Sequence, residues 1–231
     1  MNAPRIRLLR PVAGALCTAS LLSLASCNGS VCVGSDGCFD DNGLQTIALA
    51  GTAAMGGPAL ASASVRADCA DGSAATIADG NGNYGMSFAA ELPCVLTATA
   101  GGTTLHSLAF AGGTFNVTPE TELMIVYLAA QLGTNTASLI VNLPTNEHYE
   151  QVLESSGAVS AAQAAVVANL QQRYAVTLTT PSFLTTPFTV GLPGVDADLV
   201  ALANAGAIDA NGMPDPAAVS LLSQAGAANP L

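Results

Sequence analysis

The sequence contains no lysine and no tryptophan, and it has few basic or aromatic residues of any kind. All five of its basic residues are arginines, against 16 acidic residues, and aromatic residues make up 4% of the chain. Proteins that bind nucleic acid neutralise its phosphates with Lys and Arg, so this shortage argues against a nucleic-acid partner. It argues equally against electrostatic attraction to anionic lipid headgroups.

Short motifs that carry common enzyme chemistries are also absent. The sequence has no G-x-S-x-G, H-E-x-x-H or P-loop pattern, and its only histidines are His106 and His148. His106 and Ser107 fall in a predicted strand, where neighbouring side chains point to opposite faces, so they cannot simply pair as base and nucleophile. We therefore predict no catalytic residue, no cofactor and no enzyme activity.

Residues 1–26 have the pattern of a secretory signal peptide. Arg5, Arg7 and Arg10 precede an apolar stretch that runs from residue 12 to residue 25. This stretch is shorter than the roughly 20 apolar residues that a membrane span requires. We therefore expect an exported protein whose first 26 residues are removed.

The end of this segment, Leu24-Ala25-Ser26-Cys27, resembles the lipobox of bacterial lipoproteins. The resemblance implies that acyl chains such as palmitate are attached to the Cys27 sulfur and that cleavage leaves Cys27 first. Several chains together hold a protein at a membrane durably, because each buried methylene contributes about 0.8 kcal/mol. By similarity to the sorting pattern of Gram-negative lipoproteins, Asn28 favours the outer membrane. The alternative is ordinary secretion, with a cut after Ala25.

Without residues 1–26 the chain has 205 residues, which is enough for one or two domains with a real core. Only Arg66 and Arg173 then remain against the 16 acidic residues, so the formal charge is −14. We interpret this charge as a device that keeps an Ala- and Gly-rich surface soluble.

Four cysteines remain for disulfides once the signal peptide and Cys27 are set aside. Three pairings of the four are possible. Proximity in the sequence favours Cys32 with Cys38 and Cys69 with Cys94, in an oxidising compartment. A zinc site is the competing use, but neither pair has C-x-x-C spacing and no histidine lies nearby in the sequence.

Short runs that favour β-strands fill residues 44–117 and are separated by turn residues. The runs are 45–50, 59–67, 83–89, 95–100 and 103–110. Several short strands at this spacing predict an antiparallel sandwich or barrel.

This segment resembles the carboxypeptidase regulatory-like group of β-sandwiches, which is related in fold to transthyretin. The resemblance depends on Gly51, on Gly57-Pro58-Ala59-Leu60 with Ala63-Ser64-Val65, and on Thr76 with Asp79-Gly80-Asn81-Gly82-Asn83-Tyr84. It implies an Ig-like sandwich without catalytic activity, acting as a spacer, a partner-binding unit or a carbohydrate-associated accessory. Asp79, Asn81 and Asn83 also echo the start of a calcium loop, but Tyr84 stands where such a loop needs glycine, so we favour an Asx-rich turn.

Residues 118–231 are predicted to be α-helical. Thr118-Pro119-Glu120 has the pattern of a helix start, and the apolar residues 123–130 predict a buried helix that Gly133 ends. We expect further helices over 146–155, from a Ser160–Gln163 capping box to Tyr174, over 196–205, and from Asp215-Pro216 to Gly226. Residues 177–193 are predicted to be irregular or extended.

These observations predict an α+β protein of four segments: a signal peptide (1–26), a tether with a short disulfide loop (27–43), a sandwich (44–117) and a helical region (118–231). The leading hypothesis is a non-enzymatic lipoprotein of the cell envelope that binds or scaffolds an envelope protein or glycan. The alternative is a carbohydrate-associated accessory or hydrolase whose site forms only in three dimensions. The residues of that site would be His148 with Glu147, Glu150 and Glu154. The same four side chains could bind a metal ion, but such a cluster is more often a solvated helix face.

Overall fold

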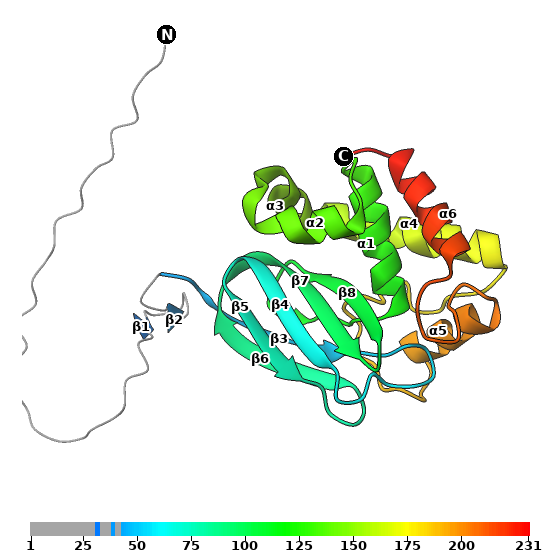
Figure 1. The fold of residues 1–231 in the computed structure, drawn as a ribbon, viewed down its shortest axis with the longest axis horizontal. Helices are drawn as coiled ribbons and strands as arrows, with labels where there is room; N and C mark the ends of the chain where they lie inside the picture. The colour runs from blue at the N-terminus through cyan, green and yellow to red at the C-terminus, as the bar shows by residue number, and fades with distance from the viewer. Residues whose placement is uncertain (1–30, 33–37, 40–42) are drawn as a thin grey trace, which may run out of the picture.

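The computed structural model describes residues 31–32, 38–39 and 43–231 (Figure 1). The predicted signal peptide, the lipobox and Cys27 therefore lie outside the described residues. So do the side chains of Cys32 and Cys38, although the backbones of these two residues pair in the antiparallel ladder of β1 and β2. The helices and strands are β1 (Val31–Cys32), β2 (Cys38–Phe39), β3 (Thr46–Thr52), β4 (Ser64–Asp71), β5 (Ser73–Ile77), β6 (Asn83–Ala89), β7 (Glu91–Ala100), β8 (Thr103–Ala109), β9 (Gly113–Thr114), α1 (Pro119–Gln131), α2 (Thr136–Asn142), the 3-10 turn η2 (Leu143–Thr145), α3 (Glu147–Glu154), α4 (Ser156–Tyr174), α5 (Val195–Asn204) and α6 (Pro216–Ala227).

The fold is a mixed α+β arrangement in which the strands precede the helices, as predicted. In the described part of the chain, the β1–β2 pair is accompanied by two sheets, a four-stranded one with the order β5-β4-β7-β8 and a three-stranded one with the order β6-β3-β9. The expectation of purely antiparallel pairing is wrong at one place, because β9 runs parallel to β3. The sequence pattern also missed β5 and β9, which are too short or too rich in alanine to alternate clearly.

Burial along the strands shows how the sheets are covered. In β4, Val65, Ala67 and Cys69 are buried while Ser64 and Arg66 are exposed, which is the alternation of a strand with one face in the core. In β7 the run from Pro93 to Leu96 is buried on both faces. This is consistent with the helical elements that contact the four-stranded sheet, namely η2 on β4, α3 on β7 and α1 on β8 (Figure 1).

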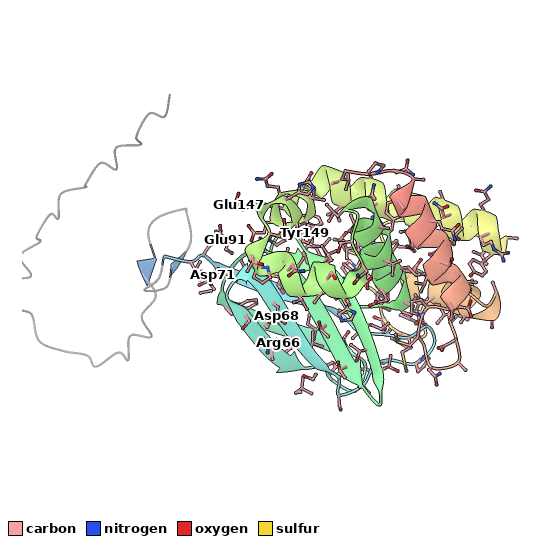
Figure 2. All side chains as sticks on the ribbon, turned by 45° about the horizontal axis from the view of Figure 1, so that its top comes forward. Arg66, Asp68, Asp71, Glu91, Glu147 and Tyr149 are labelled. Carbon is pink, nitrogen blue, oxygen red and sulfur yellow. A yellow bond between two sulfur atoms is a disulfide. The ribbon has the colours of Figure 1, made fainter. Side chains whose placement is uncertain are left out.

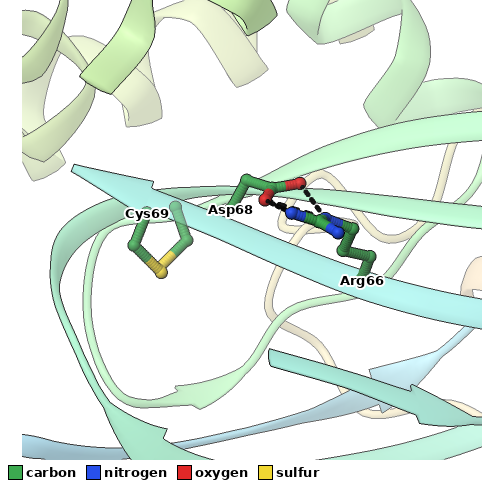
Figure 3. Close-up of a disulfide and its surroundings, with 4 residues drawn as sticks. Arg66, Asp68 and Cys69 are labelled. Atoms are coloured by element: carbon green, nitrogen blue, oxygen red, sulfur yellow. Dashed lines mark hydrogen bonds and ion pairs between the residues drawn. A yellow bond between two sulfur atoms is a disulfide. The ribbon is translucent and has the colours of Figure 1, made fainter. Parts of the chain in front are cut away.

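A disulfide joins Cys69 and Cys94, as the sequence predicted. The two residues are directly opposite in the β4–β7 register, so the bond joins the two central strands of the four-stranded sheet, near the end of β4 (Figure 3). On the same strand, Arg66 donates hydrogen bonds to the carboxylate of Asp68. Both side chains are well exposed, so this ion pair contributes little to stability.

The helix α1 is the central helix of the C-terminal half. Thr118 and Thr121 form its capping box, which confirms the predicted start. Leu123, Met124, Ile125 and Leu128 are fully buried, because the helix lies between β8, α4 and α6. No single helix in the described part of the chain is long and apolar enough to cross a membrane; α1 and the α2–η2 segment meet that criterion only as a pair bent by 83°.

Two of the helix boundaries predicted from the sequence are wrong. The long helix α4 begins at Ser156, after the N-cap Ser155, so Ser160 and Gln163 lie inside it and form no capping box. Gly226 does not end α6 but lies within it, where it packs against α1. The remaining helix predictions agree with the structure within one or two residues, and α2 was not predicted.

Candidate functional site

A groove of about 650 Å³ lies where the described body of the chain begins, between α3 and the ends of strands β3 and β7. We call it the acidic groove because four carboxylates line it. Its lining residues are Gly43, Leu44, Gln45, Ile47, Ala90, Glu91, Leu92, Glu147, Glu150, Gln151 and Glu154.

The helix α3 brings three of these carboxylates to one side. Asn146 caps the helix, its Oδ1 accepting hydrogen bonds from the backbone N–H groups of His148 and Tyr149 at 3.1 and 3.2 Å. Residues spaced three and four apart share a helix face, so Glu147, Glu150 and Glu154 all reach the groove. A neighbouring side of α3 is held to the core by Leu153, which is fully buried.

The fourth carboxylate, Glu91, comes from the first residue of β7. It pairs across the sheet with Asp71, next to an irregularity in the β4–β7 register. Asp71, Glu91 and Glu147 gather at the same end of the molecule (Figure 2). Like charges directly opposite one another destabilise a sheet. The described lining residues of the groove include no arginine, so this surface is strongly negative.

His148 does not belong to the acidic groove. Its side chain is exposed and its ring lies 6.5 Å from the ring of the following Tyr149. The structure therefore brings together the three predicted glutamates of α3 but separates them from the histidine. Within the residues that the structure describes, no group of three His, Cys, Asp or Glu side chains is arranged to hold a metal ion.

The calcium-like segment at Asp79 forms a closed turn. Asp79 Oδ1 accepts hydrogen bonds from the backbone N–H groups of Asn81 and Asn83, both at 2.8 Å. These bonds, chiefly the one from Asn83, hold the pKa of the Asp79 carboxyl below its ordinary value. The Asp79 carboxylate thus accepts hydrogen bonds from its own turn, as expected for an Asx-rich turn.

The same turn occurs a second time in the chain, at Asp209. Its Oδ1 accepts from the backbone N–H groups of Asn211 and Met213 at 2.8 and 2.9 Å. Gly212 takes the positive φ that Gly82 takes in the first turn. The shared pattern D-x-N-G is visible in the sequence and identifies both turns.

His106 has a carboxylate partner that its sequence neighbours do not reveal. Its ring Nδ1 lies 2.8 Å from Glu122 Oε2 on α1, and its backbone N–H donates to the same oxygen at 2.6 Å. Thr121 Oγ1 donates to the His106 carbonyl. Two residues of α1 therefore satisfy the outward-facing backbone N–H and C=O of His106 on β8, an edge strand.

Three buried carboxylates lie in and near the first turns of α1 and α5. Asp196 and Asp198 are each 3% exposed and accept backbone hydrogen bonds, Asp196 from Gly57 and Gly191 and Asp198 from Thr179 and Thr180. Glu120 is 1% exposed, and its Oε2 has no hydrogen-bond partner.

Burial, and to a lesser degree the charge of Asp198, raises the pKa of Glu120 to about 8. The positive end of the α1 dipole favours an anion by at most about 2 kcal/mol. Burying an ionised carboxylate costs several kcal/mol, so the desolvation cost is the larger effect. Burial therefore favours the neutral acid form of Glu120 over the carboxylate.

Comparisons with known proteins do not place the chain in a family. No family model matches it, and neither the curated proteins nor the solved structures contain a match.

Proposed function

We propose that the protein is an exported lipoprotein of the cell envelope, anchored by acyl chains on Cys27, with a non-enzymatic role in binding or scaffolding another envelope component. The observation that carries this proposal is the Leu24-Ala25-Ser26-Cys27 box after a basic and apolar segment. Asn28 supports the outer membrane as its address.

We also propose that the two sheets form an Ig-like or transthyretin-like sandwich. The consecutive strands β5 and β6 contact each other but belong to different sheets, so the chain passes from one sheet to the other between them. Within the three-stranded sheet, Tyr84 of β6 donates a hydrogen bond across β3 to the carbonyl of Phe115, and both residues are buried in the core that the two sheets share. These contacts support a compact spacer or binding module of the carboxypeptidase regulatory-like kind.

The acidic groove is the surface on which we expect a partner to bind. It lies beside Gly43, where the chain that follows Cys27 enters the described body, and its carboxylates are accessible. A partner that enters the groove has to present basic or hydrogen-bonding groups, because an anion would be repelled.

The alternative function is a carbohydrate-associated accessory or hydrolase at the same groove. A pair of carboxylates can hydrolyse glycosides, one acting as acid and the other as base or nucleophile, and Glu91, Glu150 and Glu154 provide carboxylates from both sides. A Glu150→Gln, Glu154→Gln variant distinguishes the two functions. If the protein is a hydrolase, the wild type releases product from glycans and the double variant does not. If it is a binding module, neither the wild type nor the variant releases product.

The anchor is tested by mass spectrometry of the mature N-terminus. We expect an acylated Cys27 and release of a Cys27→Ala variant from the membrane fraction. An unmodified N-terminus at Ser26 or Asn28 would overturn the lipoprotein proposal.

The groove is tested by photo-crosslinking in intact cells from a reactive residue at position 151, with position 224 on α6 as the matched control. Both positions hold an exposed glutamine. We expect a discrete crosslinked partner from position 151 and none from position 224. The same products from both positions would contradict a specific role for the groove.

A further inference from the structure

A buried acid remains that neither the anchor nor the acidic groove uses. Glu120 is the second residue of α1 and is enclosed on all sides, and its Oε2 makes no hydrogen bond. A buried polar atom without a partner is costly in a native structure, and it is most costly when it carries a charge. The geometry therefore disfavours the carboxylate and admits the neutral acid.

Among the residues that the structure describes, no cation acts on Glu120 to balance a charge. The group that acts on it is Asp198 on α5, which repels a second carboxylate. The other acidic groups on neighbouring elements are engaged elsewhere: Glu122 with His106 on β8, Asp196 with Gly57 and Gly191, and Asp215 with the N–H of Ala217 on α6. Both arginines of the described chain also have other partners, Asp68 for Arg66 and the Tyr174 ring for Arg173.

Asp198 is not free to move away from Glu120. It accepts the backbone N–H groups of Thr179 and Thr180 and the hydroxyl of Thr179, at 2.7 to 3.0 Å. These bonds tie the irregular segment after α4 to α5. Further along the same segment, the carbonyls of Phe183 and Thr186 accept hydrogen bonds from Asn116 Nδ2, both at 2.8 Å. The segment 179–186 is thus held at one end beside Asp198 and at the other end just before α1.

We infer that Glu120 is a pH-sensitive latch: as a neutral acid it lets the first turn of α1 close against α5 and the segment 179–186, and its ionisation at alkaline pH loosens this junction. The trigger is the desolvation cost of a charge on Glu120 in this dry site, to which repulsion by the fixed carboxylate of Asp198 adds. The coupling to the medium rests on the export proposed above: an exported protein meets the pH of its surroundings directly, so such a group couples the packing of the helices to the medium.

The direction of the pH dependence follows from the two ionisation states. In the folded protein burial raises the pKa of Glu120 to about 8, above its ordinary value of 4.5 in the unfolded chain. Between these two values the folded state binds one proton more, so its stability is complete below about pH 4.5 and falls as the pH rises towards 8. From this group alone the folding equilibrium constant decreases about tenfold per pH unit in that window.

The experiment compares the full chain with its Glu120→Gln and Glu154→Gln variants from pH 5 to 9.5. Urea unfolding gives the folding equilibrium constant, and hydrogen exchange corrected for intrinsic rates gives the opening of the segment 179–186. We expect Glu120→Gln to remove most of the decrease with pH and to keep the segment protected at pH 9. Glu154→Gln, on the exposed face of α3, should follow the wild-type curve. Identical pH curves for Glu120→Gln and the wild type would overturn the latch.

A second measurement does not depend on that variant folding. Carbon-13 NMR of the wild-type chain labelled at glutamate carboxyls should show one group that titrates near pH 8, and Asp198→Asn should lower that midpoint by removing the repelling charge. If all glutamates titrate below pH 6, the inference fails. It also fails if millimolar Ca²⁺ or Mg²⁺ raises the melting temperature of the wild type but not of Glu120→Gln, because the site then holds a metal ion instead of a proton.

Discussion

Glu122 accepts two hydrogen bonds from His106 through one carboxylate oxygen, one from the backbone N–H at 2.6 Å and one from ring Nδ1 at 2.8 Å. This contact joins the first turn of α1 to the edge strand β8. The side chains of the two residues are 12% and 21% exposed, respectively, so the bonds are only partly screened by water. The junction between sheet and helices is therefore fastened by a polar contact as well as by apolar packing.

We expect Glu122→Ala to lower the free energy of unfolding by about 2 kcal/mol, because it removes hydrogen bonds to a charged acceptor and leaves a backbone N–H without its partner. Urea denaturation measures the change. Glu154→Ala removes an exposed carboxylate from α3 and should stay within about 0.5 kcal/mol of the wild type. Equal losses in the two variants would show that the His106 contact contributes nothing.

Asn116 joins the three-stranded sheet to the segment before α5. Its Oδ1 accepts from the Thr52 N–H at 3.2 Å, while its Nδ2 donates to Phe183 and Thr186. Asn116→Asp has the same shape but cannot donate, so a buried carboxyl would face two carbonyl oxygens. We expect a loss of about 3 kcal/mol, the cost typical of unpaired buried polar groups.

The matched control for this substitution is Asn142→Asp. Asn142 Nδ2 donates to the carbonyl of Ser138 on an exposed helix surface, where water replaces the lost bond. We expect a change of at most about 0.5 kcal/mol. If thermal unfolding shows the same loss of stability for Asn116→Asp and Asn142→Asp, then the hydrogen bonds of Asn116 do not stabilise the contact between the sheet and the segment before α5.

Gly226 allows α6 to approach α1 closely. A Cβ at this position would collide with the carbonyl oxygen of Tyr127 and lie 2.9 Å from the Cβ of Ala130. Gly226→Ala should therefore destabilise the protein by about 2 kcal/mol despite the better helix propensity of alanine. Gly157→Ala, in the first turn of α4, meets only the Ser155 hydroxyl at 3.8 Å and should stabilise by up to about 1 kcal/mol. The same sign for both substitutions in denaturant unfolding would contradict the close packing of α1 and α6.

The disulfide between Cys69 and Cys94 closes a loop with a sequence separation of 25. In the chain-entropy account a loop of this size contributes about 3 kcal/mol. We expect the Cys69→Ala, Cys94→Ala double variant to unfold at correspondingly lower urea, with reductant changing its midpoint little. Peptide mapping without reductant should recover the two cysteines joined, and free thiols at both positions would defeat the prediction.

Local patterns in the sequence determined much of this protein. Thr118-Pro119 fixed the start of α1 because capping needs only a hydroxyl and a few neighbouring N–H groups. The apolar residues 123–130 indicated a buried helix. The even number of cysteines left after the predicted signal peptide and Cys27, together with their proximity in the sequence, indicated the Cys69–Cys94 bond. The turn at Asp79 could also be predicted from the sequence, since the hydrogen bonds that close an Asx turn come from its own residues.

Only the tertiary structure decided what depends on segments far apart in the chain. From local sequence, Gly226 is predicted to end a helix, but in the structure it lies inside α6 and packs against α1. Glu120 is predicted to be an ordinary first-turn carboxylate, but in the structure it is buried near Asp198 and excluded from water. Likewise, the glutamates of α3 line the groove together with Glu91 and without His148. The reason is that the burial of Leu153 sets which face of the helix meets the sheet. Helix caps and turns are local, whereas close packing, desolvation and the meeting of charges are properties of the assembled core.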